Sequence, residues 1–487
     1  MTEPVLVGEL LPGVVAEAIV RAGAGYERWM ELVAQTGYCA HPVRLRGRVE
    51  QADPQTGEVR TVYSTDREPD ATLLKACGNR RVSVCPSCSA TYQADSFQLL
   101  AAGLRGGKGV PDTVAAHPRL FVTFTAPSFG RVHSRKAQGL LVFPCHPYRQ
   151  GQSCPHGRRL GCWQRHDEDD PRLGEPLCAR CYQAGAQVLW NALAGRLWSR
   201  TTIYVYRALA QLVGLSEGEL RRLVRISFAK VAEYQRRGAV HFHAIIRLDA
   251  ATDCGCPACV APPSAGFTAE LLETAIRRTA ATVGVPCPAL EEDQDVTLIA
   301  RWGEQLDVRH IDADDGGELS AEQVAGYVAK YATKGIEALG VTLDHRICEV
   351  ELEGLNVPAH VAELVRACWE LGARPSLARL RLRKWAHMLG FGGHFSTKSR
   401  RYSTTLGALR RVRVAYAIRR RRGDALPLDA WGRPEDDQAV IVVASWAYLG
   451  RGYQSTGEAW LAASAAARAR EERWIAKEEL RATTIAA

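Results

Sequence analysis

Two histidines occupy alternate positions in an otherwise apolar stretch of the chain, Ala239–Arg247. Side chains two residues apart lie on the same face of a β-strand, so His241 and His243 are predicted to point in the same direction. Two imidazoles can bind one metal ion when a third ligand lies nearby. The alternative is that both rings simply pack on the surface of a sheet.

The third ligand is predicted to come from Glu233 or Gln235. Arg236, Arg237 and Gly238 follow them and are typical of a tight turn, so the segment is expected to fold back as a hairpin beside the histidines. A charged oxygen suits Mg²⁺ or Mn²⁺ better than an amide, which favours Glu233. Such a three-ligand site leaves metal positions open for water or a phosphate oxygen.

A second segment, residues 321–334, consists largely of helix formers. Ser320 precedes it as a predicted N-cap, and Gly335 follows it as a predicted stop. Tyr327 and Tyr331 are four residues apart, which places them on one face of the helix. The alternative is an ordinary half-buried helix face.

Lys330 and Lys334 form a second pair with the same spacing beside the tyrosines. Ammonium groups there could hold phosphates or stabilise a phenolate. A tyrosine hydroxyl has a pKa near ~10 and attacks poorly unless the phosphate is polarised. A metal ion on the histidines could supply that polarisation, so the two tyrosines and two lysines are predicted catalytic residues.

Fifteen cysteines favour metal sites over disulfides in a reducing compartment, with free buried thiols as the alternative. One structural Zn²⁺ site is predicted from Cys39, Cys77, Cys85 and Cys88. For a second, the first choice is Cys162, His166, Cys178 and Cys181, with Cys154 and His156 as competitors. A third is possible at Cys254, Cys256, Cys259 and Cys287.

Basic residues are concentrated in one part of the chain. The net charge is +9 over 487 residues, yet residues 374–422 hold fifteen Lys or Arg and no Asp or Glu, interleaved with aromatic residues. Basic groups bind phosphates and aromatic rings stack on bases, which predicts contact with single-stranded or melted DNA. A preference for Arg caused by base composition would not explain the missing acids. The candidate contacts are Lys398, Arg400, Arg401, Tyr402, Arg410 and Arg411.

Targeting signals are not evident. No apolar run reaches the ~18 residues of a membrane span, and the first residues, with Glu3 and Glu9, lack the basic start of a signal peptide. A cytoplasmic protein without membrane contact is therefore expected. The glycine-rich segment 103–109 does not match the phosphate-binding Walker pattern, because no Ser or Thr follows Lys108, so no helicase is evident.

Five consecutive segments are predicted. The first two are an N-terminal helical segment at 1–35 and a zinc-binding region at 36–115. A nuclease domain follows at 116–340, with Cys-rich insertions at 143–184 and 250–294. A basic helical DNA-binding region at 341–425 and a helical tail at 426–487 complete the chain. Strands are expected at 119–126, 222–231, 239–248 and 295–301, and a long helix at 185–212.

The two motifs, together with the apolar segment Phe121–Thr125, resemble the three motifs of HUH endonucleases, and the two-tyrosine form is similar to the phage gene A proteins. Across residues 36–415, the segments 77–81, 85–88, 301–309 and 393–402 resemble the RepSA-like initiators of actinobacterial plasmids and integrative conjugative elements. The resemblance implies an α+β fold with an antiparallel, ferredoxin/RRM-like sheet. It also implies rolling-circle replication.

In such proteins a tyrosine nicks one DNA strand at an origin, forms a 5′-phosphotyrosine link and leaves a 3′-OH that primes a polymerase. The host helicase and polymerase are the implied partners. Tyr327 aligns with the leading tyrosine of the family motif, but the helix geometry does not settle which tyrosine acts first. A relaxase or a transposase would use the same chemistry. A non-catalytic zinc-containing DNA-binding regulator is the alternative from another class, and it would form no covalent adduct.

Overall fold

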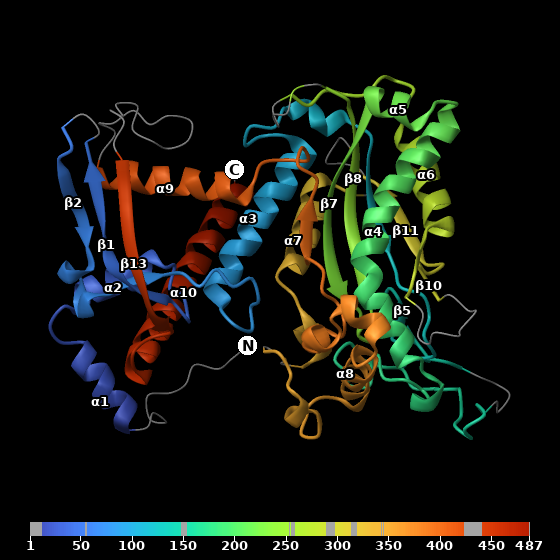
Figure 1. Ribbon diagram of the computed structural model, residues 1–487, viewed down its shortest axis with the longest axis horizontal. Coiled ribbons are helices and arrows are strands. Elements are labelled where there is room, and N and C mark those ends of the chain that lie inside the picture. The colour runs from blue at the N-terminus through green and yellow to red at the C-terminus, as the bar shows by residue number, and fades with distance from the viewer. Residues whose placement is uncertain are drawn as a thin grey trace. The chain divides into compact units, whose positions relative to one another are not determined.

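The computed structural model divides the chain into two compact units. One combines Met1–Asp95 with Gly407–Ala487, and the other is Ser96–Leu406 (Figure 1). The structure describes residues 12–53, 56–147, 153–252, 254, 259–288, 298–312, 319–341, 343, 345–422 and 441–486.

A five-stranded sheet forms the centre of the larger unit. Each neighbouring pair is antiparallel, and the order is β11 (Leu306–His310), β4 (Arg119–Phe124), β8 (Val240–Ala250), β7 (Val224–Tyr234) and β12 (Ser396–Lys398). The expected strands at 119–126, 222–231 and 239–248 are confirmed. A mixed α and β fold with an antiparallel sheet is likewise confirmed.

The two faces of this sheet are chemically different, because side chains alternate along each strand. On β8, Phe242 and Ile246 point into the hydrophobic core that includes α4 (Ala184–Val213), α6 (Ala269–Thr282) and α8 (Ala359–Gly372). His241 and His243, which flank Phe242, point to the opposite face. There α7 (Ala321–Ala332) packs against β7 (Figure 1). The helix expected at 185–212 is confirmed as α4.

Polar side chains on that opposite face hold the end of α3 (Pro86–Arg105). The buried Arg247 donates to the carbonyl of Gly103, and the buried Arg119 donates to the carbonyl of Leu104. The last carbonyls of a helix have no partner within the helix, so these guanidinium groups satisfy them and match the negative end of its dipole. Asp249 pairs with Arg247 and balances one of the buried charges.

The smaller unit is built from both ends of the chain. Its helices include α1 (Pro12–Arg21), α2 (Tyr26–Gln35) and α10 (Thr456–Ala486). Its sheet has the order β13 (Ile441–Arg451), β1 (Val43–Ala52) and β2 (Val59–Ser64), with β3 (Leu73–Lys75) also paired with β1. The five predicted segments do not group the two ends in this way, and their finer boundaries stay predictions.

The helical tail predicted for residues 426–487 needs correction, because β13 lies within it. Its sequence begins Ile441-Val-Val and includes Trp446 and Tyr448, residue types that favour strands. The part from Thr456 onward is helical, as predicted.

Shorter elements complete the described structure. A basic helix, α9, spans Leu406–Arg422. The remaining α-helix is α5 (Glu217–Leu223), and the remaining strands are the short β5 (Lys136–Gln138), β6 (Leu141–Phe143), β9 (Gly284–Pro286) and β10 (Ile299–Arg301). None of the helices in the described parts of the chain has the length and apolar composition needed to cross a membrane.

Candidate functional site

The two histidines are positioned by the hairpin that joins β7 and β8. Its register places Glu233 opposite His241 and Val231 opposite His243. The predicted turn is present: Gly238 has a φ of 80°, and the backbone N–H of Gln235 donates to the carbonyl of Ala239. A positive φ of this kind favours glycine, so the sequence fixes the turn and the turn fixes the register.

Glu233 and the two histidines converge on one point. One carboxylate oxygen of Glu233 lies 3.0 Å from Nε2 of His241 and 3.1 Å from Nε2 of His243. Burial opposes ionisation of Glu233, but the hydrogen bonds from the histidines outweigh it and lower its pKa to about 2. Two imidazoles and an ionised carboxylate are thus within reach of a single cation.

A threonine on the neighbouring strand orients His243. Oγ1 of Thr123 lies 3.0 Å from Nδ1 of His243, so Nε2 is directed toward Glu233. Burial lowers the pKa of His243, which favours the neutral form that can bind a metal. Phe121, on the same face of β4, stacks on this imidazole with 5.8 Å between ring centroids.

Gln235, the other predicted ligand, is used differently. Its side-chain oxygen accepts a hydrogen bond of 3.0 Å from Nε of Arg237, which also donates to two backbone carbonyls. Arg237 is half-buried, and burial lowers its pKa. The amide therefore helps to hold the turn, and the group that the structure brings to the histidines is Glu233.

The tyrosine helix begins where the sequence predicted. The hydroxyl of Ser320 accepts from the backbone N–H of Gln323, and the side chain of Gln323 accepts in return from the backbone of Ser320, forming a capping box. The helix ends at Ala332, three residues before Gly335. Its buried face is apolar, which leaves the tyrosines on the face toward the histidines.

Both tyrosine rings contact His243. The ring centroids of Tyr327 and Tyr331 each lie 5.3 Å from that of His243, and they lie 4.7 Å from one another. Tyr327 is 43% exposed, whereas Tyr331 is half-buried. Burial, a hydrogen bond with Tyr327 and the charge of Glu233 raise the pKa of Tyr331 well above its ordinary value. Tyr327 is therefore the more exposed of the two tyrosines.

The two predicted lysines differ. Nζ of Lys334 lies 3.7 Å from the carboxylate of Glu233 and 4.4 Å from the ring centroid of Tyr331, so it belongs to the site. Lys330 is exposed on the helix. A pocket of about 530 Å³ opens beside the cluster and is lined by Glu233, Gln235, Arg236, His241, Lys334 and Glu337.

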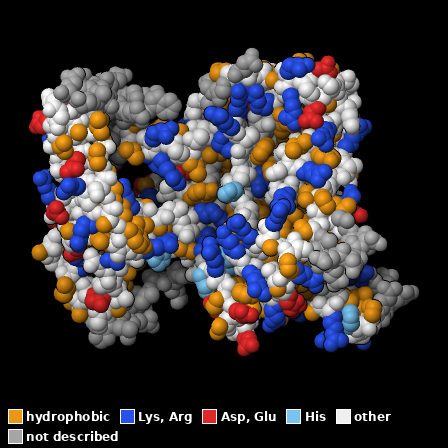
Figure 2. Space-filling model, viewed as in Figure 1, with side chains coloured by type: hydrophobic (Ala, Val, Ile, Leu, Met, Phe, Trp, Pro, Cys, Tyr) orange, Lys and Arg blue, Asp and Glu red, His pale blue; other side chains and the backbone are white. Residues whose placement is uncertain are grey.

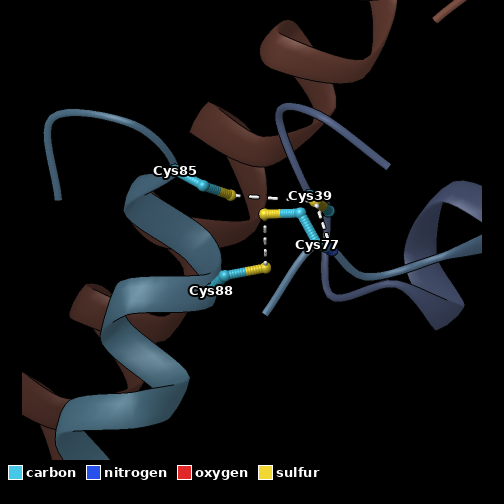
Figure 3. Close-up of side chains that lie close together, drawn as sticks. All are labelled: Cys39, Cys77, Cys85 and Cys88. Carbon is cyan, nitrogen blue, oxygen red and sulfur yellow. Dashed lines mark hydrogen bonds between the residues drawn. The ribbon is translucent and has the colours of Figure 1, made fainter. Parts of the chain in front are cut away.

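The predicted tetrathiolate cluster is assembled in the smaller unit (Figure 3). Sγ of Cys77 lies 3.7 Å from Sγ of Cys88, and Sγ of Cys85 lies 3.8 Å from Sγ of Cys39. Four thiolates around Zn²⁺ at ~2.3 Å would be about 3.8 Å apart. Contacts with Cys39 and Cys88 hold the pKa of Cys85 well below its ordinary value, although burial opposes this. These four residues could therefore hold a metal ion.

The second predicted zinc set is wrong in its grouping. The structure separates Cys162 and His166 from Cys178 and Cys181, and it completes each pair with other residues. One cluster is His133, Cys145, Cys162 and His166; the other is Cys154, His156, Cys178 and Cys181. His133 was missed because it lies twelve residues before Cys145, outside the predicted insertion. The competitors Cys154 and His156 prove to be partners of Cys178 and Cys181.

The third cysteine set does not form a cluster among the described residues. Cys256 lies outside them, Cys254 is exposed, and Cys287 is buried in the hydrophobic core of the larger unit. The apolar surroundings raise the pKa of the Cys287 thiol. A core position explains this cysteine without a metal.

The predicted DNA contacts also divide. Tyr402 is fully buried, and its hydroxyl donates to the carbonyl of Leu100 over 3.1 Å. The prediction that Tyr402 contacts DNA is therefore wrong. Lys398 donates to three backbone carbonyls, one of them that of Ser403 at 2.9 Å, and Arg401 donates to Thr252. These two cations stabilise loops. The exposed residues of the set are Arg400, Arg410 and Arg411.

Comparisons with known proteins agree with one another. A family model described as "RepSA: Replication initiator protein, pSAM2" matches residues 25–467. A "Replication initiator protein" of Streptomyces ambofaciens is 43% identical over 487 residues, which cover 99% of this chain and 97% of that protein. No solved structure gives a significant match.

Proposed function

Since the chain belongs to the RepSA family of replication initiators, we propose that it starts replication as a metal-dependent, two-tyrosine endonuclease with an HUH-type sheet. One observation carries the proposal: Tyr327 and Tyr331 contact the same imidazole that converges with His241 and Glu233. A nucleophile and a cation site therefore lie on one face of one sheet. The substrate would be origin DNA in single-stranded or melted form.

The residues of this chain would perform complementary parts of the reaction. His241, His243 and Glu233 would hold Mg²⁺ or Mn²⁺, which when bound supplies Lewis-acid polarisation of the scissile phosphate. The hydroxyl oxygen of Tyr327 would form a bond to phosphorus while the bond from phosphorus to the 3′-oxygen breaks. The phenolic proton is lost to solvent, and the departing 3′-oxygen is protonated.

Tyr327 is assigned the first attack because it is the more exposed tyrosine. Tyr331, with its raised pKa, would act later on the regenerated origin and release a circle. Lys334 would balance the charge of the Glu233 carboxylate and of the phosphate. Each exchange replaces a phosphodiester by a phosphotyrosine ester, so the bond energy is retained and the strand can be rejoined.

The remaining features support a DNA-bound initiator that depends on its host. The tetrathiolate cluster would hold a structural Zn²⁺ in the smaller unit. Figure 2 shows that Lys and Arg side chains outnumber Asp and Glu on the face in view, which suits a polyanionic partner. The free 3′-OH would prime a host polymerase behind a host helicase.

The proposal is tested by a strand-cleavage assay. Single-stranded oligonucleotides that tile the DNA flanking the encoding gene are incubated with the protein and Mn²⁺. His241→Ala and Glu233→Ala should each reduce cleavage by at least about 100-fold, because losing a ligand costs no less than losing its supporting residue. The exposed His345→Ala serves as the matched control and should cleave normally. Cleavage that survives both site variants would contradict the metal site.

A further inference from the structure

Eight of the nine Cys and His residues from 133 to 181 form four successive pairs, and His146 is the one that belongs to neither cluster. The first and third pairs, His133 with Cys145 and Cys162 with His166, make one cluster. The second and fourth pairs, Cys154 with His156 and Cys178 with Cys181, make the other. The pairs therefore alternate along the chain between the two sites. The chain between the two pairs of one site carries a pair of the other site.

The distances within both clusters suit tetrahedral coordination. In the first, Nε2 of His166 lies 3.2 Å from Nδ1 of His133 and 3.6 Å from Sγ of Cys162. In the second, Nδ1 of His156 lies 3.3 Å from Sγ of Cys181 and 3.8 Å from Sγ of Cys178. Ligands at ~2.0–2.3 Å around one Zn²⁺ would be separated by about 3.3–3.8 Å.

The segment has little else to hold it together. Among its described residues from 131 to 181, those that are buried are Cys145, Cys154, His166, Gly174 and Cys178, and four of these five belong to the clusters. Large apolar side chains such as Leu140, Leu141 and Trp163 are exposed instead. A segment that buries its ligands and exposes its apolar residues needs metal ions to fold.

Supporting contacts complete the first cluster. The carboxylate of Asp170 lies 2.7 Å from Nδ1 of His166, which leaves Nε2 for a metal. A carboxylate behind a ligating imidazole is a common support in zinc sites. The backbone N–H of Ser134 donates to Sγ of Cys145 over 3.2 Å, a contact that stabilises a thiolate. Two backbone hydrogen bonds between His146 and Cys162 also hold Cys145, the residue before His146, close to Cys162.

We propose that residues 131–181 form a module with two Zn²⁺ ions in a cross-braced arrangement, one with two His and two Cys ligands and one with one His and three Cys ligands. This differs from the single site expected from spacing. It does not depend on the proposed cleavage chemistry, because it concerns only metal content and folding.

The metal content of the full chain, purified under reducing conditions, tests the module. Mass spectrometry should find three Zn²⁺ per chain, two in the module and one in the tetrathiolate cluster. Cys162→Ser and Cys178→Ser should each lose one ion, and the double variant should lose two. Cys162→His should restore the ion lost in Cys162→Ser, which separates ligation from general misfolding. The exposed His345→Ala, which changes a histidine outside the module, is the control and should keep all three.

Two results would overturn the module. One is that the double variant loses a single ion, since Cys162 and Cys178 would then share one site. The other is that neither single variant loses any. Cobalt substitution gives a second readout, because Co²⁺ bound by two thiolates absorbs differently from Co²⁺ bound by three. Cys162→Ser and Cys178→Ser should therefore remove different parts of the visible spectrum.

A cleft beside the module carries a second inference, which rests on the proposed function. It has a volume of about 1100 Å³ and is lined by the exposed arginines Arg131, Arg135, Arg236 and Arg301. Its lining includes Gln235 and Arg236, which also line the pocket at Glu233 and His241. Arg131 and Arg135 come from the module, Arg236 from the β7–β8 turn and Arg301 from β10.

We infer that this cleft receives the phosphate backbone of the DNA strand that continues from the scissile phosphate. The arginines approach from three separate elements and line one continuous cleft next to the candidate metal site. Phosphates are bound mainly by such cations, and each contact with single-stranded DNA contributes about 0.7 unit to the salt dependence of binding. The zinc module would thus position one wall of the DNA path.

The inference is tested by binding a fluorescent single-stranded oligonucleotide to a Tyr327→Phe/Tyr331→Phe background, which separates binding from cleavage. Arg131→Glu/Arg301→Glu should weaken binding by at least about 10-fold and lower the salt slope by about 1.4. Arg222→Glu/Arg278→Glu makes the same charge change at exposed positions of α5 and α6. Equal weakening by both double variants, or none by the first, would overturn the inference.

Discussion

At the scale of single residues, the site depends on groups that no spacing rule identifies. The charge of Glu233 favours it over Gln235 as the third metal ligand, and the register of the hairpin places it opposite His241. His133 was missed because no short motif connects it to its partners, which only the folded chain brings near. Tyr402 was misassigned because an aromatic residue among arginines can equally pack inside, as it does under Gly103.

Thr123 should matter to metal binding although it does not face the metal directly. Thr123→Val removes the hydroxyl at Nδ1 of His243 while keeping its volume, so the imidazole loses its orientation. We expect Mn²⁺ affinity, measured by titration calorimetry, to fall by about 10–100-fold. Thr123→Ser keeps the hydroxyl and should bind nearly normally. Unchanged affinity in Thr123→Val would show that the contact is unimportant.

The buried Lys230 should lower the free energy of unfolding near neutral pH. It lies 4% exposed on the core face, and burial lowers its pKa to about 7. Between pH 7 and its unfolded pKa of ~10.4 the unfolded state binds more protons, so the free energy of unfolding rises with pH across that window. The Phe242 ring and the carbonyl of His394 offset part of the cost.

Lys230→Met should therefore be more stable than the natural chain by about 1–3 kcal/mol at pH 7. The difference should shrink as the pH approaches 10, where the lysine is neutral in both states. Urea unfolding at several pH values measures it. A variant that is less stable at pH 7 would show that the ammonium contacts outweigh desolvation.

At the scale of elements, local signals were sufficient where an element is defined by its own sequence. The strands β7 and β8 and the capped helix α7 follow from alternation, turn chemistry and the N-cap. The strand β13 was not predicted although its residue types favour a strand, and its partner β1 lies some four hundred residues earlier. The local sequence can indicate the strand, but it does not identify a partner at that distance.

The close packing of α3 gives a test at this scale. Alanine normally stabilises a helix relative to glycine by up to about 1 kcal/mol. At Gly103, however, a Cβ atom would meet the Tyr402 ring, so Gly103→Ala should destabilise the larger unit by about 1–3 kcal/mol. Gly195→Ala in α4 meets no atom within 4 Å and should be neutral or stabilising. Thermal unfolding of both variants compares them, and similar effects would contradict the packing.

At the scale of the whole molecule, the two compact units predict two unfolding transitions. The smaller unit needs both ends of the chain, because ten residues of β1 pair with β13 and α1 packs on α10. Removing residues 441–487 should therefore abolish the transition of the smaller unit and leave that of the larger one. Differential scanning calorimetry decides this, and two unaltered transitions would contradict it.

The central claim is that a tyrosine of α7 becomes joined to DNA. The most direct measurement is to trap the protein with cleaved origin DNA, digest both, and identify the tyrosine that carries the nucleotide by mass spectrometry. We predict a 5′-phosphotyrosine on Tyr327, its transfer to Tyr331 in Tyr327→Phe, and no adduct in the double variant. Cleavage without an adduct, or an adduct in the double variant, would contradict the account.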